Sequence, residues 1–269
     1  MLKTRIILIT VSVALIIGLF LLPKVVVEND NTITQNPADS VSAAIDVHAS
    51  APSEVTATIK NLRRQYDANS GNEKNAIFAD SLADLYQIAG KFDSAAWFAE
   101  EATKFFNTTE SWIKAGDQYY QAYSFALDEA RQSHFAARAQ AFYNKVLEKH
   151  PDNLEVKTKL AMTHLTETNP MQAIGMLREV LAQDPENELA LYNMGMLSIQ
   201  SGQHDRAIER LEKLVKVNPE HTQGHLLLGI AYMSAGSKTK AKAQFEKVKL
   251  LDTDPSVQAT ADSYLKDLK

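Results

Sequence analysis

The apolar positions in the C-terminal half of the chain recur every 34 residues, an interval marked by Pro151, Pro185 and Pro219. Small residues keep the same register, and so do the bulky apolar residues between them. The small residues are Ala161, Gly195 and Gly229, followed by Ala173, Ala207 and Ala241. The bulky residues are Leu160, Met194 and Leu228, followed by Leu177, Leu211 and Phe245. A constant period in this range predicts stacked pairs of helices, each pair ending at a proline because proline cannot continue a helix.

This pattern resembles the tetratricopeptide repeat, in which a small residue lies where two paired helices touch and a bulky residue fills the gap beside it. The resemblance covers residues 76–253, although the first two units match less well. It implies an all-α fold, a solenoid in which helical hairpins form a right-handed superhelix. The five expected units are 76–109, 110–153, 154–187, 188–221 and 222–254.

The second unit is longer than the others. Gly116 and Ala161 occupy equivalent positions but stand 45 residues apart instead of 34. The extra stretch around residues 124–134 contains no Gly or Pro, which predicts two lengthened helices. The helices on either side of this stretch are rich in aromatic residues, which could anchor an interface, but we favour the interpretation that they fill the space between longer helices. These aromatic residues are Tyr119, Tyr120, Tyr123, Phe125, Phe135, Phe142 and Tyr143.

The N-terminus carries an uncharged apolar run over residues 6–22. As a helix it would extend about 26 Å, slightly short of the ~30 Å hydrocarbon core of a membrane. We favour an uncleaved transmembrane anchor over residues 1–27. A cleaved signal peptide is the alternative, although no small-x-small cleavage site follows closely. Because Lys3 and Arg5 precede the run, we expect a cytoplasmic N-terminus and repeats on the extracytoplasmic side, the periplasm in a bacterium.

Three further segments flank the repeats. Residues 28–52 contain almost no large apolar side chains and are expected to form a flexible linker. Ser53 is a suitable N-cap, and residues 53–68 carry one apolar stripe, which predicts a leading helix that covers the first repeat. The remaining residues up to 75 are expected to form a loop. A capping helix with a polar outer face is expected over residues 255–269, because terminal repeats need such a cover.

Composition and motifs argue against catalysis. The chain has no cysteine, which excludes disulfides, thiol nucleophiles and zinc–thiolate sites, and it has no phosphate-binding loop or nucleophile elbow. The net charge of −5 argues against a nucleic-acid binder. We interpret His221 and His225 as surface and packing residues rather than metal ligands, His164 as a core histidine, and Asp80 and Asp84 as a solvated acidic face. We therefore expect no catalytic residue, no cofactor and no metal.

The resemblance implies recognition of another protein, because in tetratricopeptide repeats the first helix of each unit lines a concave groove. The C-terminal half of this lining is apolar and rich in methionine, which adapts its shape to different ligands. The predicted partner-binding residues are Met162, Leu165, Leu189, Tyr192, Met196, Ile199, Leu226, Ile230 and Met233. The first two units contribute a polar, acidic lining formed by Asp84, Gln87, Asp117, Tyr120 and Gln121. In an alternative arrangement, the C-terminal helix or tighter packing covers the apolar side chains.

The favoured hypothesis is a non-catalytic, membrane-tethered adaptor that binds a protein or peptide partner in this groove. The layout resembles bacterial single-pass tetratricopeptide repeat proteins that assist envelope assembly. Two alternatives remain open. One is an accessory subunit of an envelope enzyme complex, such as the machinery of cytochrome c maturation, and the other is an organelle-surface receptor with its repeats in the cytosol.

Overall fold

The computed structural model describes residues 52–69, 73–166 and 170–268. Within these ranges the chain forms twelve α-helices and one short 3₁₀ helix, and no strand. None of these helices combines the length and the apolar character that crossing a bilayer requires. The anchor predicted over residues 1–27 and nearly all of the predicted linker lie outside the described residues.

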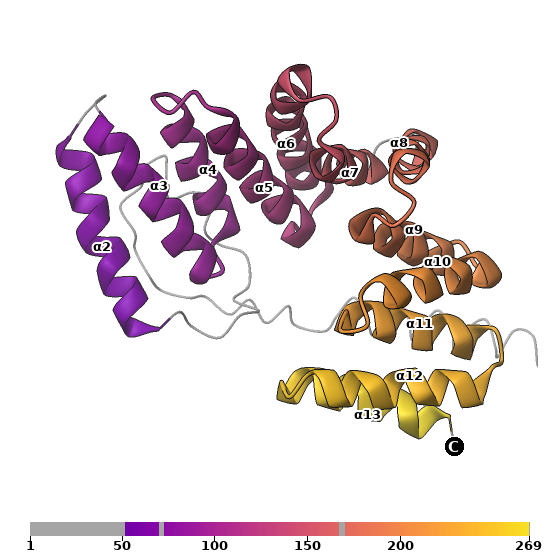
Figure 1. Ribbon diagram of the computed structural model, residues 1–269. Coiled ribbons are helices and arrows are strands. Elements are labelled where there is room, and N and C mark those ends of the chain that lie inside the picture. The colour runs from indigo at the N-terminus through magenta and orange to yellow at the C-terminus, as the bar shows by residue number, and fades with distance from the viewer. Residues whose placement is uncertain (1–51, 70–72, 167–169, 269) are drawn as a thin grey trace, which may run out of the picture. The chain divides into compact units, whose positions relative to one another are not determined.

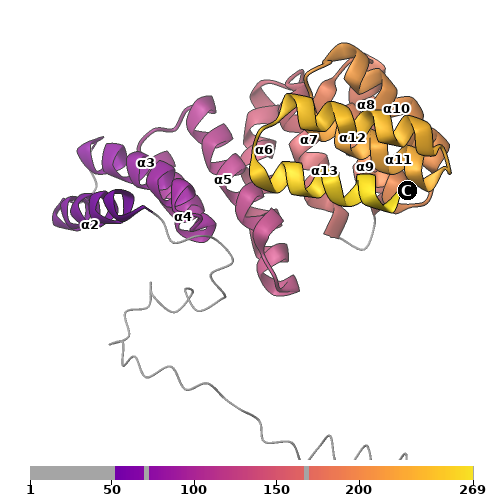
Figure 2. The same cartoon turned by 90° about the horizontal axis from the view of Figure 1, so that it is seen from below.

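Ten of the helices form five consecutive pairs (Figure 1). The pairs are α3 (Glu73–Ile88) with α4 (Phe92–Thr103), α5 (Thr109–Phe125) with α6 (Glu129–Lys149), α7 (Leu154–Thr163) with α8 (Pro170–Gln183), α9 (Glu188–Gln200) with α10 (His204–Val217), and α11 (Thr222–Ser234) with α12 (Lys238–Leu251). The 3₁₀ helix η1 (His164–Thr166) follows α7, while α2 (Ser53–Ala68) precedes the pairs and α13 (Pro255–Asp267) follows them. Each helix packs against the next one, so the prediction of stacked helical hairpins is confirmed (Figure 2).

The recurring small residues let the two helices of a unit approach closely. A Cβ atom built on Gly195 would lie 2.6 Å from Cδ2 of Leu211, and one built on Gly229 would lie 2.5 Å from Cε1 of Phe245. Real Cβ contacts are longer than this, so only glycine fits without a shift of the opposite side chain. The small residue on the first helix and the bulky residue on the second are therefore the two halves of one contact.

Each of the last three units begins with a capping side chain at the 34-residue spacing. The side chains of Asn153, Asn187 and His221 each accept a hydrogen bond, at 3.0 Å, from the backbone N–H three residues further on. Such caps satisfy one of the unpaired N–H groups at a helix start. His221 thus has a structural role in place of the surface position expected from the sequence.

The insertion in the second unit lengthens both of its helices. The α5 helix has 17 residues and α6 has 21, against 13 in α9 and 14 in α10. Tyr119, Phe135, Phe142 and Tyr143 are buried, and the rings of Tyr119 and Phe142 stack with centroids 6.1 Å apart. The aromatic residues therefore mainly fill the space between the two longer helices, as expected, but Phe125 at the end of α5 is 51% exposed.

The two flanking helices occupy the ranges expected of them, with one correction at the start of α2. Its N-cap is Pro52, whose side chain makes no capping hydrogen bond, and Ser53 is the first helical residue. Because Ser53 already lies inside the helix, the prediction that it is the N-cap is wrong. The residue at the cap position is a proline, which has no side-chain acceptor. At the other end, Tyr264 of α13 stacks on Phe245 with ring centroids 4.9 Å apart, which covers the last buried cluster.

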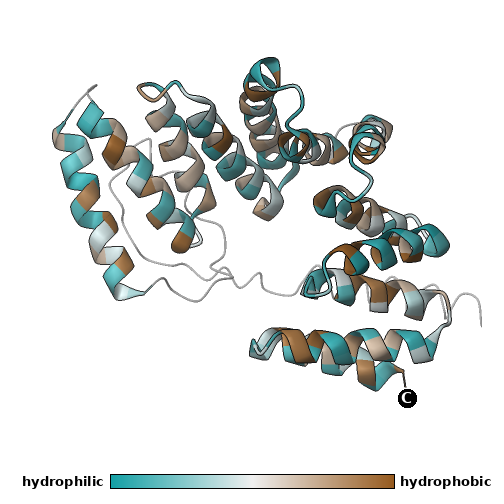
Figure 3. Cartoon of the chain, viewed as in Figure 1, coloured by the Kyte–Doolittle hydropathy of each residue, from teal (hydrophilic) through white to brown (hydrophobic). Residues whose placement is uncertain are grey.

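The buried core runs along the chain as three clusters of apolar side chains. One extends from Ala79 to Leu160, a second surrounds Leu177 and Met194, and the third surrounds Leu211 and Phe245. Polar and apolar residues alternate around most helices, as the teal and brown segments of Figure 3 show. The helices from α3 onward therefore each bury one side against their neighbours, while α2 contributes the partly buried Ile59, Leu62 and Tyr66.

Candidate partner-binding surface

The first helices of the last three units form a continuous layer, because α7 contacts α9 and α9 contacts α11. All nine predicted partner-binding residues lie on α7, η1, α9 or α11. We refer to these nine residues as the first-helix surface. Met162 is buried at 6% exposure, whereas Leu165, Leu189, Tyr192, Met196, Ile199, Leu226, Ile230 and Met233 are each partly buried.

These side chains rest on the core and are held by it. Tyr192, Ile199, Leu226, Ile230 and Met233 pack against the cluster around Leu211 and Phe245. Leu165 and Met196 pack against the cluster around Leu177. The surface therefore consists of apolar side chains that are supported from below and only partly accessible.

Tyr192 is additionally held by the cap of the next unit. Its ring stacks on the imidazole of His221, with centroids 5.6 Å apart and an interplanar angle of 20°. Burial raises the pKa of the Tyr192 hydroxyl, so this side chain stays neutral over the physiological range. A neutral aromatic ring fixed in orientation is a suitable anchor for an apolar ligand.

The C-terminal helix α13 docks along α12, the second helix of the last unit. Besides the stacking of Tyr264 on Phe245, Lys249 Nζ lies 2.5 Å from Asp262 Oδ1. Gln258 Nε2 donates a hydrogen bond to the Lys249 carbonyl at 2.8 Å. These contacts fix α13 to the opposite member of the helix pair from the one that carries the predicted partner-binding residues.

The polar lining of the first two units is tied up in contacts between units. Lys114 Nζ of α5 lies 2.7 Å from Asp80 Oδ1 and 2.8 Å from Asp84 Oδ1 of α3. These two carboxylates remain exposed to solvent, as interpreted from the sequence, and a lysine on the next unit additionally binds both. Gln118 Nε2 likewise donates to Gln87 Oε1 at 2.6 Å.

Asp117 makes a similar connection further along. Lys159 Nζ of α7 lies 2.9 Å from Asp117 Oδ2, and the Tyr143 hydroxyl of α6 donates to Asp117 Oδ1 at 2.8 Å. Burial by itself lowers the pKa of Lys159, but hydrogen bonds to Glu155 and Asp117 outweigh this effect and raise it. Tyr120 lies near Asp117, and burial is the main cause that raises the pKa of its hydroxyl to about 12. Gln121 is half-buried. The acidic charge expected on this side is thus largely neutralised within the stack.

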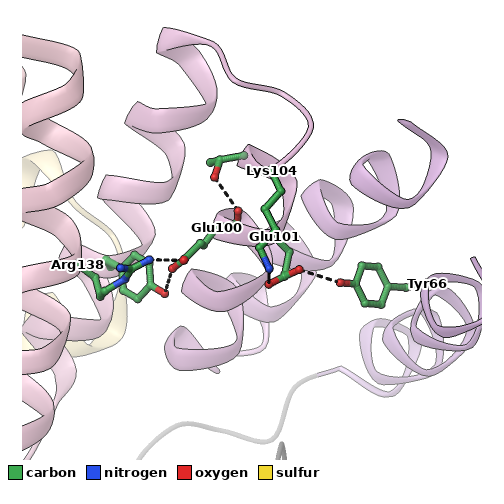
Figure 4. A network of polar contacts seen from close by, with 7 residues as sticks. Tyr66, Glu100, Glu101, Lys104 and Arg138 are labelled. Carbon is green, nitrogen blue, oxygen red and sulfur yellow. Dashed lines mark hydrogen bonds and ion pairs between the residues drawn. The ribbon is translucent and has the colours of Figure 1, made fainter. Parts of the chain in front are cut away.

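A second set of polar contacts joins α2 to α4, and α4 to both helices of the second unit (Figure 4). Glu100 of α4 accepts hydrogen bonds from Tyr119 of α5 and Arg138 of α6, and the neighbouring Glu101 accepts from Tyr66 of α2 at 3.4 Å. Burial by itself raises the pKa of Glu100, but the hydrogen bonds from Arg138 and Tyr119 outweigh it, so the pKa is lowered. These contacts hold neighbouring helices together and therefore have a structural role.

The histidines singled out from the sequence have packing roles. His225 is buried, with Nδ1 at 2.7 Å from Gln244 Oε1 and Nε2 at 3.0 Å from the Pro219 carbonyl. His164 is half-buried, and its Nδ1 lies 3.4 Å from Gln140 Nε2. In the part of the chain that the structure describes, no three His, Asp or Glu side chains gather as a metal site would require.

Two further features of functional interest come from the structure. Asn193 is buried within the first-helix layer, where its amide donates to the Leu189 carbonyl at 2.8 Å. Exposed apolar residues also gather at the turns of the first two units, at Ile88, Phe125 and Leu127. The sequence signal for these residues was available, since the equivalent turns of the last two units carry polar or small residues instead.

This architecture defines a class, the α-solenoids built from antiparallel helix pairs. The tetratricopeptide repeat family model matches the chain over residues 164–217 and again over residues 198–261. This match and the fold together support the tetratricopeptide repeat interpretation, and the predicted all-α solenoid is confirmed. None of the curated proteins matches the sequence.

Solved structures with a similar fold include TTC0263, a thermophilic tetratricopeptide repeat protein of Thermus thermophilus. It is 16% identical over 71% of this chain and 99% of its own, with a TM-score of 0.57. MamA from Desulfovibrio magneticus is 21% identical over 65% of this chain and 94% of its own, with a TM-score of 0.46. YrrB, a tetratricopeptide repeat protein with an unusual peptide-binding site, is 16% identical over 76% of this chain and 99% of its own, with a TM-score of 0.43. At 16% identity the likeness to TTC0263 shows the fold alone.

Proposed function

We propose that this chain is a non-catalytic, membrane-tethered adaptor that binds a protein or peptide segment on its first-helix surface. The observation that carries the proposal is the chemistry of α9 and α11. Tyr192, Met196, Ile230 and Met233 form an apolar set that is supported by the core yet remains partly accessible. A stack of helices held by its own core needs no accessible apolar layer on one side, so this layer is best explained by a ligand.

The magnitude of apolar burial defines the kind of ligand. Fully burying one large apolar side chain contributes about 1.5–3 kcal/mol, and these side chains have already lost part of their accessible area. Each therefore has only a fraction of that amount left for binding, and several must act together to exceed the cost of association. The fitting partner is a segment with apolar residues spaced along it, such as one face of an amphipathic helix or an extended strand.

The apolar run at residues 6–22 supports the proposed membrane tether, and the basic residues before it support the proposed orientation of the chain in the membrane. In this proposal the anchor stays in the membrane and the repeats lie on the extracytoplasmic side. A protease added to the cytoplasmic face of sealed vesicles should then leave the repeats intact. Digestion from that face would instead support the receptor with cytosolic repeats.

The binding surface is tested by placing charge on it. We expect the double variant Met196→Asp with Ile230→Asp, in the full chain, to lose at least about tenfold in affinity for partners purified with the natural sequence, since 1.4 kcal/mol corresponds to a factor of ten. The matched control is Leu250→Asp on α12, because Leu250 is 80% exposed and lies outside the first-helix surface. An unchanged partner set for the double variant, with helix content and melting temperature preserved, would refute the proposed surface.

A further inference from the structure

The turns inside the first two units display apolar side chains to solvent. Ile88, the last residue of α3, is 64% exposed, and Leu127, between α5 and α6, is 72% exposed. Phe125 is half exposed, and its ring stacks on Phe92 at the start of α4, with centroids 4.4 Å apart. The stacking brings the two turns together, and we refer to the exposed side chains of Ile88, Phe125 and Leu127 at these turns as the apolar edge.

The repeat does not require apolar residues at these positions. The last residue of α9 is Gln200, and the two residues that follow it are Ser201 and Gly202. In the fifth unit the corresponding residues are Ser234, Ala235 and Gly236. The same turns thus fold with polar or small residues, and the apolar edge needs an explanation that the fold does not supply.

The turn that carries Leu127 is held in a defined conformation. Gln132 Nε2 donates to the Ala126 carbonyl at 2.9 Å, and Asp128 caps α6 by accepting from the Arg131 backbone N–H at 2.8 Å. Arg131 also forms an ion pair with Asp93 of α4, which ties the second turn to the first unit. Arg131 thus pairs with the carboxylates of Asp93 and Asp128, while Lys91 and Glu129 beside the turns are exposed. The three side chains of the edge itself are apolar, so they offer apolar contact to whatever covers them.

The edge lies where the chain arrives from its N-terminal segment. Because consecutive helices are antiparallel, α2 begins at the end of the stack where α3 ends, α4 begins and α5 ends, the lower side of Figure 1. Only 30 residues separate Ser53, the first residue of α2, from the end of the apolar run at residue 22. Thirty residues span at most about 100 Å when fully extended, so this end of the stack lies within that distance of any surface that holds the run.

We propose that the apolar edge formed by Ile88, Phe125 and Leu127 rests on the lipid bilayer in which the N-terminal segment is anchored. This inference rests on the membrane tether of the proposed function and adds a second point of contact to it. A few apolar side chains bind a bilayer weakly by themselves, but the tether turns the second contact into an intramolecular event with a high effective concentration. A membrane also fits the small size of the edge, because a stable protein interface needs about 800 Å² from each partner.

The absence of cysteine permits a direct test with single labels in the full chain. Leu127→Cys and the control Gln200→Cys, which is the last residue of α9, would each carry an environment-sensitive nitrobenzoxadiazole probe. The labelled proteins would be reconstituted in phosphatidylcholine vesicles with and without spin-labelled lipid. We expect a blue-shifted emission and quenching by the spin label at position 127, and neither at position 200.

Further arms separate the possible failures. Adding Ile88→Asp and Phe125→Asp to the Leu127→Cys protein should abolish the quenching, and high salt should leave it unchanged because no charge is used. A probe at position 127 that stays in water while the protein floats with the vesicles would overturn the edge contact and leave the tether standing. Failure to float would overturn both. A blue shift that grows with protein concentration and is insensitive to spin-labelled lipid would assign the edge to a second copy of the chain.

Discussion

At the scale of single residues, the fold depends on matched pairs of one small and one bulky side chain. We predict that Gly229→Ala destabilises the protein by about 1–3 kcal/mol, because the added methyl group would meet the ring of Phe245. Gly175→Ala is the matched control. Apart from its chain neighbours and the backbone of its own helix turn, no atom lies within 4 Å of the added methyl group at Gly175, so helix propensity should make this variant more stable by up to about 1 kcal/mol. Urea unfolding of both variants would check the opposite signs, and equal effects would refute the account.

The cap of the last unit gives a second prediction for a single residue. His221→Ala should lower the free energy of unfolding by about 1 kcal/mol, because the Gly224 N–H loses its acceptor. His221→Asn should keep most of the stability, since Asn153 and Asn187 have the same role in the two preceding units. Thermal melts at neutral pH measure both changes. If the asparagine variant is as unstable as the alanine variant, the stacking on Tyr192 rather than the cap is what matters.

At the scale of helices, Glu100 ties α4 to α5 and α6, and the lowered pKa of its carboxyl gives a pH dependence. A carboxyl with a lowered pKa in the folded state contributes stability above its ordinary pKa of 4.5, which is lost as the pH falls through the folded value. Glu100→Gln should therefore cost about 1.5 kcal/mol at pH 7, and the difference from the natural sequence should narrow below about pH 4. Urea unfolding across this range tests the sign, and a difference that widens in acid would contradict it.

The helices and their pairing were predictable because they depend on local patterns. The spacing of Gly195, Gly229 and the prolines determined the units, and the interval from Gly116 to Ala161 indicated the lengthened helices. Contacts between distant side chains were not predictable in this way. The pairing of Lys114 with Asp80 and Asp84 depends on how two units are placed side by side, which no repeat period specifies.

The candidate site was predicted to a smaller extent than the fold. Register placed the nine residues on the first helices, and the structure finds eight of them partly buried, but Met162 is buried in the core. The position of a residue within the repeat cannot by itself distinguish a buried side chain from a partly accessible one, because the exposed fraction depends on how the neighbouring unit packs. The apolar edge at Leu127 could not be predicted for a related reason, since the repeat period does not specify which residues of a turn are exposed.

At the scale of the whole molecule, stability should be distributed unit by unit, because each helix contacts mainly its neighbours along the chain. Phe245→Ala removes a fully buried ring and should cost about 3–5 kcal/mol locally. We expect faster amide hydrogen exchange in α11, α12 and α13, with unchanged protection in α3 to α6. Hydrogen exchange measured by mass spectrometry tests this, and a uniform loss of protection along the chain would show a single cooperative unit instead.

The recurrence of a capping side chain at Asn153, Asn187 and His221 has a consequence for the evolution of the protein. Excising residues 188–221 would join Asn187 to Thr222 and leave a capped helix at the junction. Gene duplication or loss in this region can therefore change the reach of the molecule in whole steps, because the joints on either side are already interchangeable.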